Sequence, residues 1–167
     1  MAKNDTFLYY VEGEDDEKIV NALKNNYIIS GKVLPFNIVQ KKITNMYLRI
    51  FKEKTILILV FDVDTNNINI FTENLKILKE CKNIKKIILV PQVQDLEDEL
   101  KRATTIKQIK ELTNSKSNSD FKRDLLKITN IIQILKKNNF DINKFWSNEP
   151  TNNFKRFKNE SLKIKIK

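Results

Sequence analysis

One apolar run constrains the fold of this chain more than any other stretch. Residues 55–61 read TILILVF, and the run stops at Asp62. A short, unbroken run of β-branched and large aliphatic residues is typical of a strand that is buried on both faces in the middle of a parallel sheet. Parallel strands need crossover connections, which are usually helices. The sequence therefore predicts an α/β fold built around this strand.

Strands and helices alternate over the first 90 residues. Besides residues 55–61, the predicted strands are 6–11, 33–39 and 86–90. The predicted helices are 15–26, 43–52 and 68–81. Pro35 cannot donate a hydrogen bond to a neighbouring strand, which favours an edge position for the second strand. We expect a compact parallel sheet of about four strands, with right-handed crossovers and flanking helices.

From residue 95 onward the pattern becomes helical. The predicted helices are 95–103, 105–112 and 120–137. A polar loop at residues 114–119 precedes the last of these, and Asp120 is its expected N-cap. We therefore divide the chain into an α/β core, residues 1–113, and a helical and basic C-terminal extension, residues 114–167, packed on that core.

The charge distribution favours a polyanionic partner. The formal net charge is +10, and residues 151–167, with six basic residues and one acid, supply five of these charges. Basic surfaces bind nucleic acid through the release of counterions from its phosphates. Residues 1–20 are different, because they carry six acids and two lysines. An acidic patch in a basic chain indicates either a bound cation or the solvated start of a helix.

Scarce residue types limit the chemistry. The chain has no histidine and one cysteine, Cys81, which excludes a disulfide framework, a Cys-rich zinc site and the commonest general base. No apolar run reaches the roughly 20 residues of a membrane span, and the N-terminus lacks the apolar segment of a secretory signal. We expect a soluble cytoplasmic protein without a membrane partner, whose chemistry uses carboxylates, lysines or hydroxyls.

Three acids follow two of the predicted strands. Glu12 comes directly after residues 6–11, and Asp62 and Asp64 close the apolar run. Ligands of open α/β sheets bind at the carboxyl ends of the strands, and side chains two residues apart on an extended segment point the same way. Carboxylates suit Mg²⁺. The sequence predicts a magnesium site at this edge, although helix capping by the two aspartates would give the same pattern.

Gly13, one of only two glycines, follows Glu12 directly. We expect it where the backbone passes close to a ligand or adopts a conformation closed to other residues. A glycine that only makes the turn is the alternative.

The two acidic motifs resemble those of a known domain family. VEGEDD at residues 11–16, followed by FDVD at residues 61–64, is similar to the TOPRIM domain of bacterial primases, topoisomerases, ribosomal-RNA maturation ribonucleases and overcoming-lysogenization-defect nucleases. The resemblance covers residues 5–125. It implies a compact α/β fold, a role for Glu12 in acid/base proton transfer, and magnesium coordination by Asp62 and Asp64. Asp16 matches a further acid of the first motif, whereas we attribute the other acids of residues 14–17 to the helix start.

Two later stretches resemble the nuclease branch of this family. QDLEDEL at residues 94–100 is similar to its Asp-Leu-Glu segment, which implies Asp95 and Glu97 as ligands of a second metal. SKS at residues 115–117, with Phe121 downstream, resembles its lysine-bearing loop, which implies that Lys116 contacts a phosphate or stabilises transition-state charge. A helix N-cap with a solvated acidic face and an ordinary surface lysine explain these residues equally well.

Basic residues near this loop and in the tail are candidates for phosphate contacts. They are Lys116, Lys122, Arg123, Lys155, Arg156 and Lys158. Phe154 and Phe157 lie among them, and such aromatic residues either stack on bases or cover the sheet.

These features leave few functions. The length and the single cysteine leave no room for the tyrosine-bearing domain of a topoisomerase or the zinc module of a primase. The two glycines of the chain do not form the G-x-x-x-x-G-K-[ST] run that the phosphate loop of an ATPase requires. We predict a stand-alone TOPRIM nuclease, dependent on Mg²⁺ or Mn²⁺, that hydrolyses DNA or RNA in phage defence or RNA processing.

Two alternatives stay open. One is a non-catalytic nucleic-acid-binding or regulatory TOPRIM subunit that acts with a partner ATPase. The other is a toxin-like subunit that a partner protein holds inactive. The sequence also leaves a homo-oligomer open.

Overall fold

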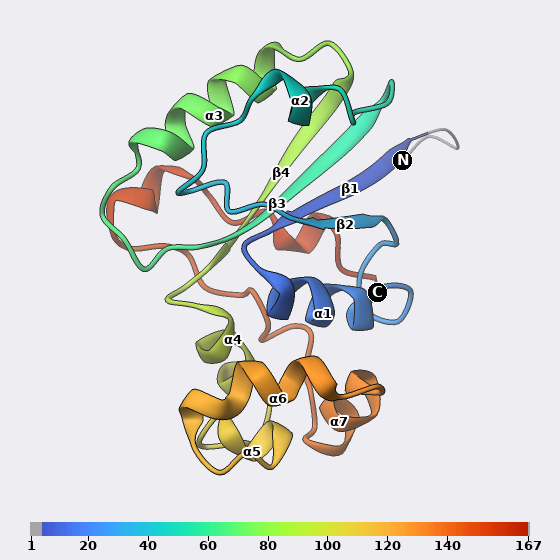
Figure 1. Ribbon diagram of the computed structural model, residues 1–167, viewed down its shortest axis with the longest axis vertical. Helices are drawn as coiled ribbons and strands as arrows, with labels where there is room; N and C mark the ends of the chain where they lie inside the picture. The colour runs from blue at the N-terminus through green and yellow to red at the C-terminus, as the bar shows by residue number, and fades with distance from the viewer. Residues whose placement is uncertain (1–4, 167) are drawn as a thin grey trace.

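The computed structural model describes residues 5–166 and contains a parallel sheet of four strands (Figure 1). The strands lie in the order β2-β1-β3-β4, and every neighbouring pair is parallel. They are β1 (Thr6–Val11), β2 (Lys32–Pro35), β3 (Thr55–Asp62) and β4 (Ile84–Gln92). This confirms the predicted α/β fold. It also confirms that the strand with Pro35 lies at an edge of the sheet.

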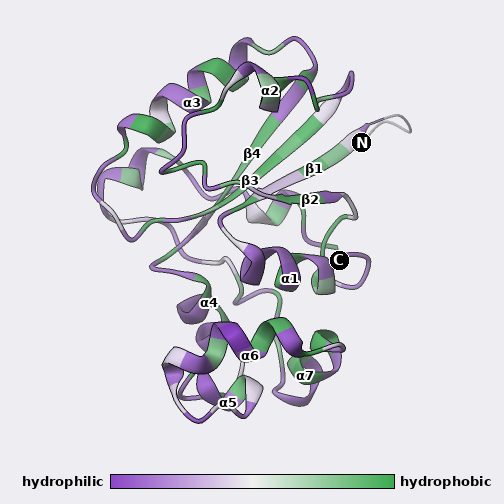
Figure 2. Ribbon diagram, viewed as in Figure 1, coloured by the Kyte–Doolittle hydropathy of each residue, from purple (hydrophilic) through white to green (hydrophobic). Residues whose placement is uncertain are grey.

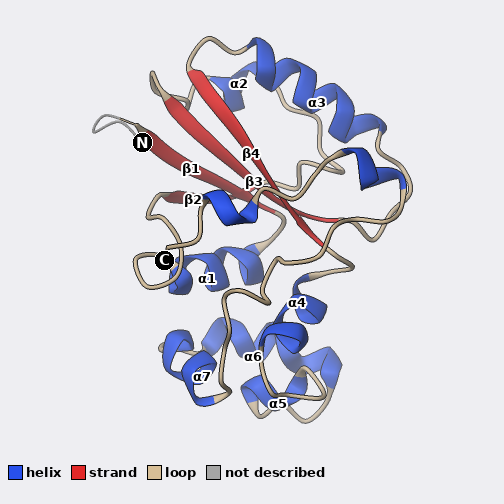
Figure 3. Cartoon of the chain, turned by 180° about the vertical axis from the view of Figure 1, so that it is seen from behind, coloured by secondary structure: helices blue, strands red, loops and turns tan. Residues whose placement is uncertain are grey.

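Helices cover both faces of the sheet (Figures 1 and 3). On one face, side chains such as Tyr9 and Ile58 pack with α1 (Glu14–Leu23), and on the other face Leu57 and Leu59 pack with α3 (Asn69–Glu80). The short α2 (Asn45–Leu48) lies on the same face as α3. Successive residues of β3 therefore enter opposite hydrophobic layers. This explains why the run 55–61 does not alternate between apolar and polar residues.

The remaining helices form a group beyond α1 (Figure 1). They are α4 (Leu96–Ala103), α5 (Lys110–Thr113), α6 (Phe121–Lys127) and α7 (Ile131–Lys137). Phe121 and Leu135 are buried in the same core as α1. Figure 2 shows hydrophobic and hydrophilic residues mixed along these helices, as expected for elements with one buried face. None of the helices described for residues 5–166 is long and apolar enough to cross a membrane; the cytoplasmic location stays a prediction.

Local hydrogen bonds shorten several predicted elements. The single helix predicted over residues 120–137 is wrong, because Ile128 is extended and the side chain of Asn130 caps a new helix by accepting from the N–H of Gln133 at 3.2 Å. Asp120 does lie at the N-cap position of α6, but its carboxylate makes no cap and accepts from the Ser117 hydroxyl at 2.6 Å. It ends a 3-10 turn, η1 (Asn118–Asp120).

Three further predictions were too long. The strand predicted over 33–39 ends at Pro35, where the Asn37 side chain accepts from the backbone N–H groups of Val39 and Gln40. The helix predicted over 43–52 is reduced to α2. The helix predicted over 105–112 is reduced to α5, because the carboxylate of Glu111 accepts from the N–H groups of residues 107 and 108 in the preceding turn.

The C-terminal segment crosses back to the sheet and contributes to both hydrophobic layers. It contains two short 3-10 turns, η2 (Asn153–Arg156) and η3 (Ser161–Lys163). Phe145 and Trp146 are buried on the α1 side, and Phe154 is buried on the α3 side. The division of the chain at residue 113 stays a prediction.

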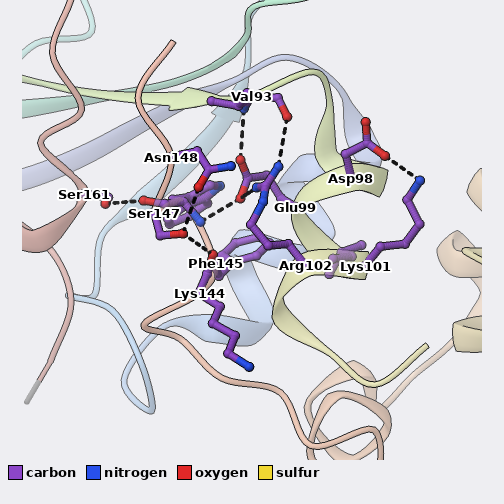
Figure 4. A network of polar contacts seen from close by, with 12 residues as sticks. Val93, Asp98, Glu99, Lys101, Arg102, Lys144, Phe145, Ser147, Asn148 and Ser161 are labelled. Carbon is purple, nitrogen blue, oxygen red and sulfur yellow. Dashed lines mark hydrogen bonds and ion pairs between the residues drawn. The ribbon is translucent and has the colours of Figure 1, made fainter. Parts of the chain in front are cut away.

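One buried carboxylate joins the end of β4 to α4 and to the C-terminal segment (Figure 4). Glu99 accepts hydrogen bonds from the backbone N–H of Val93 at 2.9 Å and of Trp146 at 2.8 Å. Its second oxygen also lies 2.6 Å from the guanidinium of Arg102. A buried charge is tolerated when it is paired and hydrogen-bonded in this way.

We predict that Glu99→Ala lowers the free energy of unfolding by roughly 3–5 kcal/mol, because it leaves Arg102 and two backbone N–H groups without their partner. Urea denaturation followed by circular dichroism measures this. Glu73→Ala is the matched control, since Glu73 forms an exposed ion pair with Lys42, and such pairs contribute at most about 1 kcal/mol. Equal losses in the two variants would contradict the role of the Glu99 network.

Candidate metal site

The predicted metal ligands stand at the carboxyl edge of the sheet. Glu12 directly follows β1, and Asp62 is the last residue of β3. The register of the parallel pairs brings these ends together, since Tyr10 lies opposite Leu59 and Asp62 lies opposite Gln92. Strand pairing thus determines which side chains meet at this edge.

Asp62 is the electrostatic centre of the group. Its Oδ1 atom is buried and has no hydrogen bond to any residue between 5 and 166. Burial raises the pKa of Asp62, and the nearby charges of Glu12, Asp16, Asp95 and Asp64 raise it further, to about 10. Four of the other acids predicted as ligands therefore act on this one carboxyl group. Asp64, two residues further on, is exposed.

Opposing effects act on the pKa of Glu12. Burial raises the pKa of its carboxyl group, and so does the charge of Asp64. The backbone N–H of Asp62 and the ammonium of Lys122 act in the opposite direction. The net shift is upward, which is the direction expected for a carboxyl group that acts as a general acid or base.

Asp16 is the most buried acid of the group, with 4% of its surface exposed. Burial and the charge of Asp15 raise its pKa to about 7, while Gln92 and a hydrogen bond to the backbone of Gly13 act to lower it. Asp16 therefore lies in the first turn of α1, beside the backbone of Gly13, and is coupled to the other acids at this edge.

Gly13 does not have a conformation reserved for glycine. Its φ of −143° and ψ of −172° are open to any residue, so that part of the prediction is wrong. A Cβ atom at this position would lie 2.9 Å from Oδ1 of Asp15. The space around Gly13 is limited by that carboxylate.

The two acids after β4 have different surroundings. Asp95 is the N-cap of α4, and its Oδ1 accepts from the N–H of Asp98 at 2.9 Å, so the capping alternative is confirmed. Its charge also raises the pKa of Asp62. Glu97 has a buried oxygen without a hydrogen bond to the described residues, and its other oxygen lies 3.4 Å from Nζ of Lys122. Asp95 is thus coupled to the first group of acids, and Glu97 is paired with a lysine.

The lysine that the structure brings to the acids is Lys122. Its Nζ lies 3.2 Å from Oδ2 of Asp15 as well as near Glu97. Partial burial acts to lower the pKa of Lys122, but these two carboxylates raise it overall. Lys116 is exposed and forms no ion pair with an acid in the part of the chain that the structure describes. Its catalytic role stays a prediction.

Gln92 is a site residue that sequence reasoning missed. It is fully buried opposite Asp62 and close enough to Asp16 to lower the pKa of that acid. Neither polar atom of its amide meets hydrogen-bond geometry with a residue in the range 5–166. The available signal was a polar residue at the end of an apolar strand, where a buried amide needs a partner.

The other predicted nucleic-acid contacts are dispersed. Arg123 pairs with its near neighbours Asp120 and Asp124. Lys155 and Lys158 are exposed, and Arg156 donates to the Thr72 hydroxyl of α3 at 2.9 Å.

The two aromatic residues of the tail pack inward. Phe154 packs on Phe61 and Phe71, with ring centroids 5.8 and 5.5 Å away. Phe157 packs on Phe71 at 4.9 Å. The ring of Phe154 is fully buried and cannot stack on a base, so the base-stacking alternative is wrong for this residue.

The donor set suits Mg²⁺, which prefers hard oxygen ligands. Buried carboxylate oxygens without partners, on Asp16 and Asp62, are groups that a cation would stabilise. Among residues 5–166, no group of three or more acidic, histidine or cysteine side chains is arranged so that it could hold a metal ion. Mg²⁺ usually keeps several waters and binds only one or two carboxylates directly. The chemistry of the acids therefore suits an ion with one or two direct protein ligands, and not one enclosed by the protein.

Comparisons with known proteins gave no match among family models, curated proteins or solved structures. What is established is an α/β fold with a four-stranded parallel sheet.

We predict that Asp62→Asn raises the free energy of unfolding of the metal-free protein by roughly 1–3 kcal/mol, because asparagine has no carboxyl group that must take up a proton on folding. A carboxyl group whose pKa is raised by folding stabilises the protein at low pH, and this stabilisation is lost as the pH rises toward the folded-state pKa. The advantage of the variant should therefore be larger at pH 9 than at pH 6.

Thermal unfolding in EDTA at these two pH values measures the effect. Asp98→Asn is the control, because Asp98 is paired with Lys101 on the surface of α4 and should gain nothing. A wild type that is more stable than Asp62→Asn at pH 9 would refute the predicted repulsion.

Proposed function

We propose that this protein is a TOPRIM-like, magnesium-dependent nuclease that hydrolyses phosphodiester bonds in DNA or RNA. The observation that carries the proposal is the coupling of Glu12, Asp16, Asp62, Asp64 and Asp95 at one sheet edge in a chain with a net charge of +10. Like charges held together in a desolvated place destabilise the fold unless a cation binds there. The basic remainder of the chain suits a polyanionic substrate.

Each residue of the site has a distinct chemical task in this proposal. Asp62 and Asp64 hold the ion, which when bound supplies charge stabilisation at the scissile phosphate. Glu12, whose pKa is raised by burial and by Asp64, exchanges a proton with the attacking water or the leaving oxygen. Lys122, whose charge acts on Glu12, places a positive charge beside the reacting group. The biological setting that we propose is phage defence or RNA processing.

One observation favours a second candidate, a non-catalytic nucleic-acid-binding or regulatory subunit that acts with a partner ATPase. Within residues 5–166, the acids do not form a complete set of direct metal ligands. In this case the acidic group would shape the fold or a partner interface, and the basic surface alone would bind nucleic acid.

We predict that wild-type protein cleaves single- or double-stranded DNA or RNA with Mg²⁺ or Mn²⁺ and that EDTA abolishes cleavage. Glu12→Gln and Asp62→Asn should each lose at least about 100-fold in rate, as expected for the loss of a proton-transfer group or a metal ligand. Lys122→Ala should lose roughly 100- to 1,000-fold, because it removes charge stabilisation from the transition state. Gel-based cleavage assays on purified variants measure these rates.

Lys85→Ala is the matched control for Lys122→Ala, because Lys85 also pairs with an acid, Asp5, but at the opposite edge of the sheet, near the start of β4. Its rate should stay near that of the wild type. Equal activity in the wild type and in Glu12→Gln and Asp62→Asn would refute the proposed nuclease. Nucleic-acid binding that is unchanged in EDTA, without cleavage under any condition, would establish the second candidate instead.

A further inference from the structure

The loop that carries Asp64 is held by the C-terminal segment. This loop connects β3 to α3. The side-chain amide of Asn152 donates to the backbone carbonyl of Val63 at 2.7 Å and to that of Thr65 at 3.2 Å. The amide of Asn153 donates to the carbonyl of Asn66 at 2.7 Å. The backbone on both sides of Asp64 is therefore bonded to residues nearly 90 positions later in the chain.

The two asparagines are themselves firmly anchored. The Oδ1 atom of Asn152 caps η2 by accepting from the N–H of Phe154 at 2.9 Å. The ring of Phe154 is fully buried against Phe61, the residue before Asp62, and against Phe71 of α3. Arg156 adds a hydrogen bond to Thr72 of α3. The segment is thus fixed to the two elements that flank the loop.

The loop has limited support of its own. The N–H of Val63 still donates to the carbonyl of Gln92 at 3.1 Å and continues the sheet. Beyond it, Thr65 and Asn67 accept bonds from backbone N–H groups two residues later, while Asp64 is exposed. Short turns of this kind shape a loop locally but do not fix it against the rest of the fold.

We infer that Asn152 and Asn153 are positioning residues that hold the Asp64 loop in place, so that the C-terminal segment completes the metal site. The metal part of this inference rests on the proposed function, whereas the holding of the loop does not. A ligand on a loop binds an ion tightly only if that loop is ordered beforehand, because ordering it on binding reduces the affinity. The three hydrogen bonds from Asn152 and Asn153 hold the loop in one conformation before an ion binds.

The test uses the double variant Asn152→Ser/Asn153→Ser in the full-length chain. Serine is a good N-cap, so at position 152 it keeps an oxygen for the N–H of Phe154 while removing the amide that reaches the loop. We expect faster amide hydrogen exchange in residues 63–67 and about tenfold weaker Mn²⁺ binding by calorimetry, consistent with the net loss of a few modest hydrogen bonds.

Asn130→Ala is the control. It removes a different bond between an asparagine side chain and the backbone, in which the Asn130 oxygen accepts from the N–H of Gln133 at the start of α7. Its Mn²⁺ affinity and the exchange of residues 63–67 should equal those of the wild type.

Two outcomes would overturn the inference: unchanged exchange of the loop in the double variant, or faster exchange with unchanged Mn²⁺ affinity. A wild type that binds no Mn²⁺ would refute the proposed function and with it the positioning role. The exchange rates would then still decide whether the asparagines hold the loop.

Discussion

The parallel pairing of β3 with β1 and β4 is the constraint on which the rest of the structure depends. It buries β3 on both faces, and it directs the carboxyl ends of all strands to one edge. Acids that follow different strands must then meet there, whatever their separation in sequence. The helices α1 and α4 also begin at this edge, directly after β1 and β4, and their N-terminal dipoles stabilise negative charge.

Those dipoles offset only part of the repulsion. The pKa values of Asp16, at about 7, and Asp62, at about 10, remain raised because burial and neighbouring carboxylates disfavour the charged forms. Lys122 neutralises the outer acids, Asp15 and Glu97, rather than Asp62. The structure therefore retains in its centre carboxyl groups that are costly to ionise without a cation. Such local strain is characteristic of functional sites, where a ligand supplies the missing stabilisation.

The sequence was most informative where one local pattern agreed with tertiary burial. The strand at residues 6–11 and the apolar run ending at Asp62 were predicted with nearly their observed bounds. A short run that is apolar on both faces forms few structures other than a buried strand. The break at Asn130 was not predicted. The apolar residues on either side of it keep the spacing of one helix, although the Asn130 side chain caps a new helix there. Lys122 was not recognised as a neighbour of the acids either, because its position depends on how α6 packs, and residue type alone carries no such information. For Gln92 the sequence offered one signal, a polar residue at the end of an apolar strand.

The C-terminal segment shows what an argument from composition leaves out. Its lysines suggested a nucleic-acid contact, and Lys155 and Lys158 are indeed exposed. Its asparagines and Phe154 point the other way, into the β3–α3 loop and the core. The turn η2 thus contains both the exposed Lys155 and Asn153, which is bonded to the Asp64 loop. Under the proposed function, a polyanion bound to Lys155 would contact the turn that orders this loop, so that polyanion binding and the position of Asp64 would be coupled.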